Sequence, residues 1–151
     1  MPIRCACIVY GARRKLQEGL QLRNLTSLNS ILESTSILET ALAFTAAGCS
    51  VFPLKPRSKI PYKGFGWAEF QQRIATPDEI HGWVRKYPNM NLALVTGAIS
   101  GIFVIDGDGI EGLKWIKENI PQTGIISITA KGEHYIFFLK TVPRSQMIQK
   151  S

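Results

Sequence analysis

The amino-acid sequence predicts a domain of the α/β type (α+β), with a mixed sheet and flanking helices. The chain has 151 residues and is 45% hydrophobic, so it can bury one core of ordinary size. Short runs rich in β-branched and aromatic residues indicate strands, whereas longer segments with apolar residues three and four positions apart indicate helices. Both kinds of segment occur in turn from residue 36 onwards.

Residues 1–35 show no clean periodicity. Leucines between Leu16 and Leu28 suggest a helical face among polar residues. We expect residues 1–35 to form an N-terminal arm, ahead of a domain that spans residues 36–151.

The domain is expected to begin with a helix and a short strand. Apolar residues from Ile37 to Leu42 recur at helical spacing, and Gly48 suits the C-terminal cap of this helix. The segment 50–54 has the composition of a strand. Pro53 favours an edge position for that strand, because proline has no amide hydrogen to donate.

A second helix is predicted from a capping-box sequence. Thr76 can cap the helix, Pro77 suits its first turn, and Glu79 completes the box. Apolar residues between Ile80 and Tyr87 then recur at the spacing of one buried helical face.

An apolar strand followed by two aspartates is the central feature of the sequence. The strand is the run from Ile102 to Ile105, and a further strand is expected at 92–96. Residues two apart in a strand point to the same side, so Asp106 and Asp108 should project together. Two like charges held that close repel unless a cation lies between them or one takes up a proton. Mg²⁺ and Mn²⁺ prefer carboxylate oxygens, so the pair is a candidate metal site, with a solvated turn as the alternative.

The remaining elements follow the aspartates. Residues 110–120 have helical periodicity, and the runs 125–129 and 134–139 predict a hairpin. Lys131 and His134 lie at the glycine-containing turn of this hairpin. Together they can hold a phosphate through charge and hydrogen bonds, although a single histidine at a strand start is more often an ordinary surface residue.

The charge of the chain suits an anionic partner. Its 18 Lys and Arg residues against 11 Asp and Glu residues give a net charge of +7, which suits nucleic acid or nucleotide phosphates. A moderately basic protein without such a partner is the alternative. Lys55, Arg57 and Lys59 lie in a proline-containing loop and are candidates for phosphate contacts. A solvated surface loop is the alternative for such a charge run.

Composition argues against several classes of protein. The three cysteines have no regular spacing, so they support neither a disulfide framework nor a four-ligand zinc site. The apolar segment 3–10 is followed rather than preceded by its basic cluster, unlike a signal peptide. The uncharged segment 91–105 is interrupted by glycines and is too short to span a bilayer. We therefore expect a cytoplasmic protein without a membrane partner.

In order and spacing, these segments resemble the N-terminal domain of bifunctional DNA primase/polymerases, a family of the archaeo-eukaryotic primase superfamily. The densest match is Asn91-Leu-Ala-Leu-Val-Thr-Gly97 with Ser100-Gly-Ile-Phe-Val-Ile-Asp106, followed by Asp108. The other matching segments are Ala43-Phe44 through Gly48, Val51-Phe-Pro-Leu-Lys-Pro56, Trp67 with Phe70-Gln71, Thr76-Pro-Asp-Glu-Ile80, and Thr129-Ala-Lys-Gly-Glu-His-Tyr135.

The resemblance implies roles for individual residues. Asp106 and Asp108 correspond to the first motif, which binds the catalytic Mg²⁺ or Mn²⁺ ions. His134 ends the second motif and contacts the phosphates of the incoming nucleotide, with Lys131 assisting. The implied fold is an RNA-recognition-motif-like sheet that carries the acidic pair, beside a smaller α/β subdomain.

The implied activity is two-metal phosphoryl transfer, in which a nucleotidyltransferase makes or extends primers for the replication of a phage or another mobile element. The expected partners are a DNA template and primer, nucleoside triphosphates, and a helicase on the same or another chain.

Two features depart from the family pattern. Gly107 replaces the apolar residue that usually separates the two acidic residues, and glycine is expected to loosen the backbone that holds them. The third acidic motif of the family follows the histidine strand, but residues 140–151 contain no Asp or Glu. The sequence is therefore expected to be a C-terminally truncated member, with weaker metal binding and doubtful activity as an isolated chain.

Two other functions stay open at this point. The domain could be a non-catalytic remnant that binds nucleic acid or nucleotides. The strand with Asp106-Gly-Asp-Gly109 also resembles the first motif of haloacid-dehalogenase-type phosphatases, although Ile110 and the position in the chain fit that family poorly. A calcium-binding loop is excluded because Ile110 and Lys117 occupy ligand positions.

Overall fold

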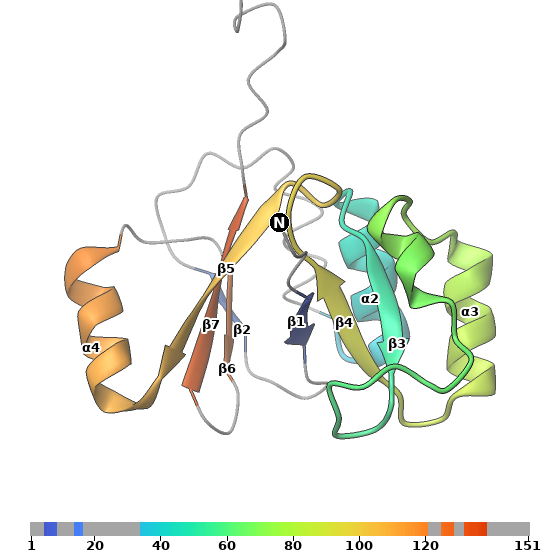
Figure 1. Cartoon of the computed structure of the whole chain (residues 1–151), viewed down its shortest axis with the longest axis horizontal. Helices are drawn as coiled ribbons and strands as arrows, with labels where there is room; N and C mark the ends of the chain where they lie inside the picture. The colour runs from blue at the N-terminus through green and yellow to red at the C-terminus, as the bar shows by residue number, and fades with distance from the viewer. Residues whose placement is uncertain (1–4, 9–13, 17–33, 121–124, 129–131, 139–151) are drawn as a thin grey trace, which may run out of the picture.

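A computed structural model of the 151-residue chain describes residues 5–8, 14–16, 34–120, 125–128 and 132–138 (Figure 1). Its α+β class agrees with the prediction from the sequence. The elements, in chain order, are β1 (Cys5–Ile8), β2 (Arg14–Leu16), α2 (Ile37–Ala46), β3 (Val51–Leu54), the 3-10 helix η1 (Trp67–Gln71), α3 (Pro77–Lys86), β4 (Asn91–Val95), β5 (Ile102–Asp108), α4 (Gly109–Asn119), β6 (Ile125–Ile128) and β7 (Gly132–Phe138).

The described strands form two antiparallel sheets, in place of the one mixed sheet that the sequence predicts. The first sheet has the order β1-β4-β3 and the second has the order β2-β6-β7-β5. Figure 1 shows α2 and α3 beside the first sheet and α4 beside the second. The chain passes between the sheets from β4 to β5 through a turn that Gly97 and Gly101 form with positive φ angles of 95° and 61°. Short connections such as the one between β6 and β7 permit only antiparallel pairing.

The larger core lies where α2 and α3 pack with the first sheet, and it includes residues of the second sheet. Ile102 of β5 and Ile136 of β7 are buried in this same core, and Val104 packs against it. The largest of its fully buried side chains are Phe44, Phe52, Leu54, Ile80, Met90, Leu92, Leu94, Ile102 and Ile136. One face of the β5–β7 pair is therefore turned toward the first sheet.

The opposite face of the β5–β7 pair packs against α4. Ile116 of α4, Ile126 of β6 and Tyr135 of β7 form this smaller core. The hydroxyl of Tyr135 donates a hydrogen bond to the carboxylate of Glu133. Burial, together with this carboxylate, raises the pKa of Tyr135 to about 12.

Local sequence signals account for the ends of α2 and for the position of β3. Ser36 and Glu39 form a complete capping box at the start of α2. Gly48 follows the end of the helix with a φ of 84°, a conformation that favours glycine. β3, which contains Pro53, lies at the edge of its sheet as predicted.

The N-terminal segment contributes two short strands. β1 pairs with β4 and β2 pairs with β6, so both lie at the edges of the two sheets. The helical face suggested between Leu16 and Leu28 lies almost wholly outside the described residues. The division into an arm at 1–35 and a domain at 36–151 stays a prediction.

α3 begins at the capping box predicted from the sequence, and an arginine reinforces it. The side chain of Thr76 accepts a hydrogen bond from the Glu79 amide, and the Glu79 carboxylate accepts one from the Thr76 amide. Nη1 and Nη2 of Arg73 donate to the two carboxylate oxygens of Glu79 at 2.8 and 2.6 Å. This guanidinium lowers the pKa of Glu79 from its ordinary 4.5 to about 2.

This lowered pKa gives a pH-dependent prediction for Glu79→Gln. We expect the substitution to lower the unfolding free energy at pH 7, because it removes the charge that caps α3 and pairs with Arg73. The loss should be only about 1 kcal/mol, since the ion pair is partly exposed and water weakens it. A depressed pKa stabilises the fold above the unfolded pKa, so the difference should shrink as the pH falls from 4.5 to about 2. Thermal unfolding of both proteins across this range measures it. A difference that stays constant with pH would contradict the assignment.

Candidate functional site

β5 places the two aspartates on one face of the second sheet. Along the strand, Asp106 is exposed, Gly107 is buried and Asp108 is exposed. This alternation is the period of a strand with one covered face, so the two carboxylates project to the same side. It is the side on which Ile102 and Val104 contact the larger core, so the aspartates extend that face beyond the apolar residues.

Gly107 is explained by close packing, not by a need for a flexible backbone. A Cβ atom at this position would lie 2.9 Å from both Ile116 Cδ1 and Leu113 Cδ2 of α4. The strand remains paired here, with Gly107 opposite Glu133. Glycine therefore lets α4 approach the strand directly behind the carboxylates, which corrects the expectation that it loosens their backbone.

His134 lies opposite Asp106 in the β5–β7 register. Its Nε2 atom is 3.3 Å from Asp106 Oδ1. The imidazole is only 13% exposed, whereas the side chain of Asp106 is 67% exposed. The pairing of two strands thus brings together a histidine and an aspartate that are 28 positions apart in the sequence, with the carboxylate on the solvent side.

Asp108 ends β5 and occupies the N-cap position of α4. Its side chain makes no capping hydrogen bond to the helix, which an N-cap aspartate ordinarily does. No ion pair joins Asp108 to a basic side chain in the described part of the chain. Both features leave its carboxylate oxygens available to an external ligand.

Gly132 allows β7 to lie close to β5 at the aspartates. It is the register partner of Asp108, and a Cβ atom built on it would lie 2.0 Å from the backbone oxygen of Gly107. Only glycine fits at this distance, so Gly132 fixes the spacing of the strands beneath the acidic pair.

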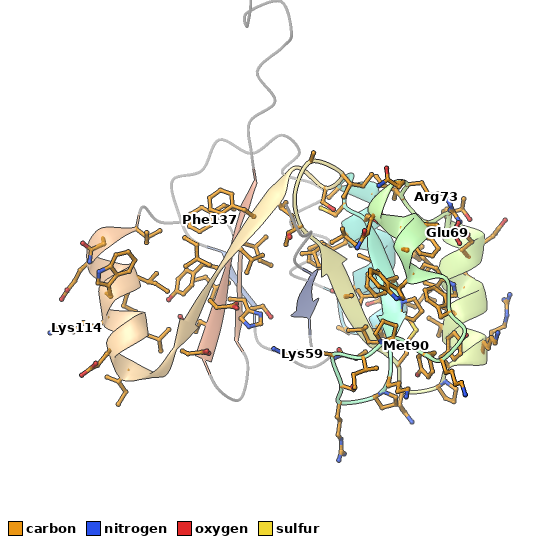
Figure 2. The ribbon with its side chains drawn as sticks, viewed as in Figure 1. Lys59, Glu69, Arg73, Met90, Lys114 and Phe137 are labelled. Carbon is orange, nitrogen blue, oxygen red and sulfur yellow. The ribbon has the colours of Figure 1, made fainter. Side chains whose placement is uncertain are left out.

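The basic loop of residues 55–63 has a fixed backbone and exposed charges. The Lys55 amide donates to the Ile60 carbonyl at 2.9 Å, and the side chain of Asn91 donates to the Ser58 carbonyl at 3.0 Å. Lys55, Arg57 and Lys59 are all exposed. Figure 2 shows the side chain of Lys59 extending from this loop toward the sheet that carries β5 and β7. Lys131, the other predicted phosphate contact, lies outside the described residues.

The acidic pair has the donor chemistry of a divalent-cation site. Two exposed carboxylates at one strand end suit Mg²⁺ or Mn²⁺, which proteins often hold through one or two carboxylates while substrate phosphates fill other positions. Within residues 34–120, 125–128 and 132–138, no group of three or more His, Cys, Asp or Glu side chains could hold a metal ion.

None of the helices described has the length and apolar character needed to cross a lipid bilayer.

Ser127 of β6 lies in one cross-strand row with His134 of β7 and Asp106 of β5. The sequence alone does not identify it as a candidate. It is the register partner of His134 on β6, as Asp106 is on β5. In the backbone register of β2 and β6, the next residue along the row is Arg14. A serine within an apolar strand was the available signal, but its significance depends on a register that one strand alone does not specify.

Comparison with known proteins identifies the family. A family model described as "Bifunctional DNA primase/polymerase, N-terminal" matches residues 41–151, which is most of the chain. Neither the curated proteins nor the solved structures gave a match. The matched region includes β5, β7 and the basic loop, and hence the residues described above. The chain therefore belongs to the bifunctional DNA primase/polymerase N-terminal family and is a domain of the DNA primase/polymerase type.

Proposed function

We propose that this domain catalyses nucleotidyl transfer to a primer on a DNA template, during replication of a phage or another mobile element. The observation that supports this best is the geometry of Asp106, Asp108 and His134. Two carboxylates project from one strand end, and an imidazole nitrogen lies 3.3 Å from the first of them. Such an arrangement suits nucleotidyl transfer, in which cations and a triphosphate must be held side by side.

Asp106 and Asp108 are the residues that would hold divalent ions. When bound there, Mg²⁺ or Mn²⁺ supplies Lewis-acid stabilisation of the triphosphate charge and lowers the pKa of the attacking 3′-hydroxyl. The carboxylates contribute negative charge and a fixed direction, since β5 is paired with β7 along its whole length. α4, packed directly against Gly107, supports the strand from behind.

His134 is proposed to hold the phosphates of the incoming nucleotide. Its Nε2 atom lies beside the acidic pair, and an imidazole N–H there can donate to a phosphate oxygen. Because the ring is mostly buried, its orientation is restricted before the nucleotide arrives. Positioning and electrostatic stabilisation, rather than covalent catalysis, would then provide the rate enhancement.

Lys55, Arg57 and Lys59 are proposed to contact template or nucleotide phosphates, with Lys131 assisting His134. We expect the triple change of the loop residues to Gln to weaken DNA binding. It should also reduce the steepness with which affinity falls with salt, because each lost phosphate contact removes about 0.7 to 0.9 from the logarithmic slope. Fluorescence anisotropy at several salt concentrations measures both quantities.

A matched variant controls for net charge in this experiment. Changing Arg85, Lys114 and Lys117 to Gln removes the same charge from exposed positions on α3 and α4. It should have little effect on the slope. Equal effects of the two triple variants would show that overall charge, and not the loop, governs binding.

Primer extension tests the proposed function. The full chain is incubated with a primed template, deoxynucleotides or ribonucleotides, and Mn²⁺ or Mg²⁺, and we expect the primer to lengthen. DNA or nucleotide binding without extension would instead identify a non-catalytic binding module. The family assignment argues against the phosphatase alternative, and release of phosphate through a phosphoryl-aspartate at Asp106 would revive it.

A further inference from the structure

Two buried polar atoms on the paired strands β6 and β7 have no hydrogen bond in the described part of the chain. Ser127 Oγ and His134 Nδ1 have no hydrogen-bond partner among the described residues. Ser127 is only 1% exposed and is the register partner of His134. Buried polar groups in native proteins are nearly always satisfied, and leaving them unpaired is unfavourable. These two atoms therefore require an explanation.

The spacing of the strands allows the two side chains to meet. Residues directly opposite each other in an antiparallel pair have Cβ atoms about 4.5 to 5.5 Å apart. A serine hydroxyl and an imidazole nitrogen can span that separation after rotation about their own side-chain bonds. No movement of the backbone is needed.

The position of Asp106 indicates which nitrogen of the imidazole carries the hydrogen. An ionised carboxylate only accepts hydrogen bonds, so Nε2, at 3.3 Å from Asp106 Oδ1, is the nitrogen that should carry the hydrogen. In a neutral imidazole the other nitrogen, Nδ1, then has a lone pair and needs a donor. The hydroxyl of Ser127 is a donor, and β6, which carries it, lies on the opposite side of β7 from β5 and Asp106.

We propose that Ser127 is a positioning residue for His134. Its hydroxyl donates a hydrogen bond to Nδ1 and thereby holds the imidazole as the Nε2–H tautomer, with this hydrogen directed at the acidic pair. Transfer of this hydrogen bond from the Asp106 carboxylate to a nucleotide phosphate, when a nucleotide binds, rests on the proposed function. The bond between Ser127 and His134 does not.

The tautomer of His134 is measurable by ¹⁵N NMR of the imidazole nitrogens. The chain has only two histidines, and His81 is exposed on α3, so His81→Gln assigns the two sets of signals. In alkaline solution, where each ring carries a single hydrogen, the ring signals report the tautomer directly. We expect His134 to be predominantly Nε2–H in the wild-type protein, a mixture in Ser127→Ala, and predominantly Nε2–H again in Ser127→Thr.

Further variants keep this test decisive. Ser100→Ala removes another buried serine hydroxyl, which accepts a hydrogen bond from the Ser50 amide at 2.8 Å, and it should leave the His134 tautomer unchanged. If Ser127→Ala does not fold, Ser127→Val replaces it, because valine has the shape of the threonine variant but carries no hydrogen-bond donor. An Ala or Val variant with the wild-type tautomer would overturn the proposal.

Activity provides a second readout that separates the two proposals. With nucleotidyl transfer established, Ser127→Ala should lower kcat/KM about tenfold, in the range of other residues that orient a functional histidine, and Ser127→Thr should restore it. If the wild-type protein has no polymerase activity but the tautomer of His134 still changes when Ser127 is replaced, the proposed function is wrong and the hydrogen bond stands. Wild-type activity in Ser127→Ala, with an unchanged tautomer, would remove the positioning role alone.

Discussion

Primer extension by Asp106→Asn and by Asp108→Asn should each fall by about 100-fold or more. An amide keeps the size of the side chain but removes the negative charge that would hold a divalent ion. Metal ions contribute several kcal/mol to phosphoryl transfer, and each 1.36 kcal/mol corresponds to a tenfold change in rate. Single-turnover extension assays with Mn²⁺ measure the loss.

DNA binding distinguishes this catalytic loss from unfolding. Both variants should bind DNA as well as the wild type or more tightly, because negative charge has been removed beside an anionic ligand. Glu111→Gln, an exposed change in the first turn of α4, serves as the matched control and should retain its activity. Full activity in either aspartate variant would contradict a role for that carboxylate in the reaction.

Gly132→Ala should have the largest effect on stability, a loss of about 3 kcal/mol. The added methyl group would lie 2.0 Å from the backbone oxygen of Gly107, and only separation of β7 from β5 relieves such a contact. Gly107→Ala should cost less, because there the methyl group meets the ends of the Ile116 and Leu113 side chains, which can rotate. Urea unfolding, followed by circular dichroism, gives the free energy for each variant.

A helical glycine provides the control for this comparison. Gly82 lies within α3 with nothing within 4 Å of a Cβ built on it, so Gly82→Ala should stabilise the protein by about 0.5 to 1 kcal/mol. Equal stability of Gly132→Ala and the wild type would mean that the two strands are not held at this spacing.

Local signals in the sequence were sufficient to predict most of the elements. The capping box at Thr76, the glycine after α2 and the apolar run before Asp106 each act over a few residues, so they are visible without the fold. The placement of Asp106 and Asp108 on one side of a strand follows from the same short-range geometry.

The features that depend on strand pairing could not be predicted in the same way. The proximity of His134 to Asp106, and of Ser127 to His134, is set by the registers of β5, β6 and β7, which no single segment specifies. The sequence shows only that Gly107 is conformationally free, whereas the reason for a glycine at this position is the close approach of α4. β1 and β2 are too short to give a periodic signal in the sequence. They form strands because they pair with β4 and β6.

Manganese binding tests the central proposal most directly. The wild-type protein should take up Mn²⁺ saturably in isothermal titration calorimetry. Once the heat of Mn²⁺ binding to free triphosphate is subtracted, it should bind more tightly when a deoxynucleoside triphosphate is present, because substrate phosphates add ligands to the ion. The double variant Asp106→Asn/Asp108→Asn should show neither effect while unfolding as cooperatively as the wild type. Undiminished Mn²⁺ uptake by the double variant, or none by the wild type, would contradict a metal site at the end of β5.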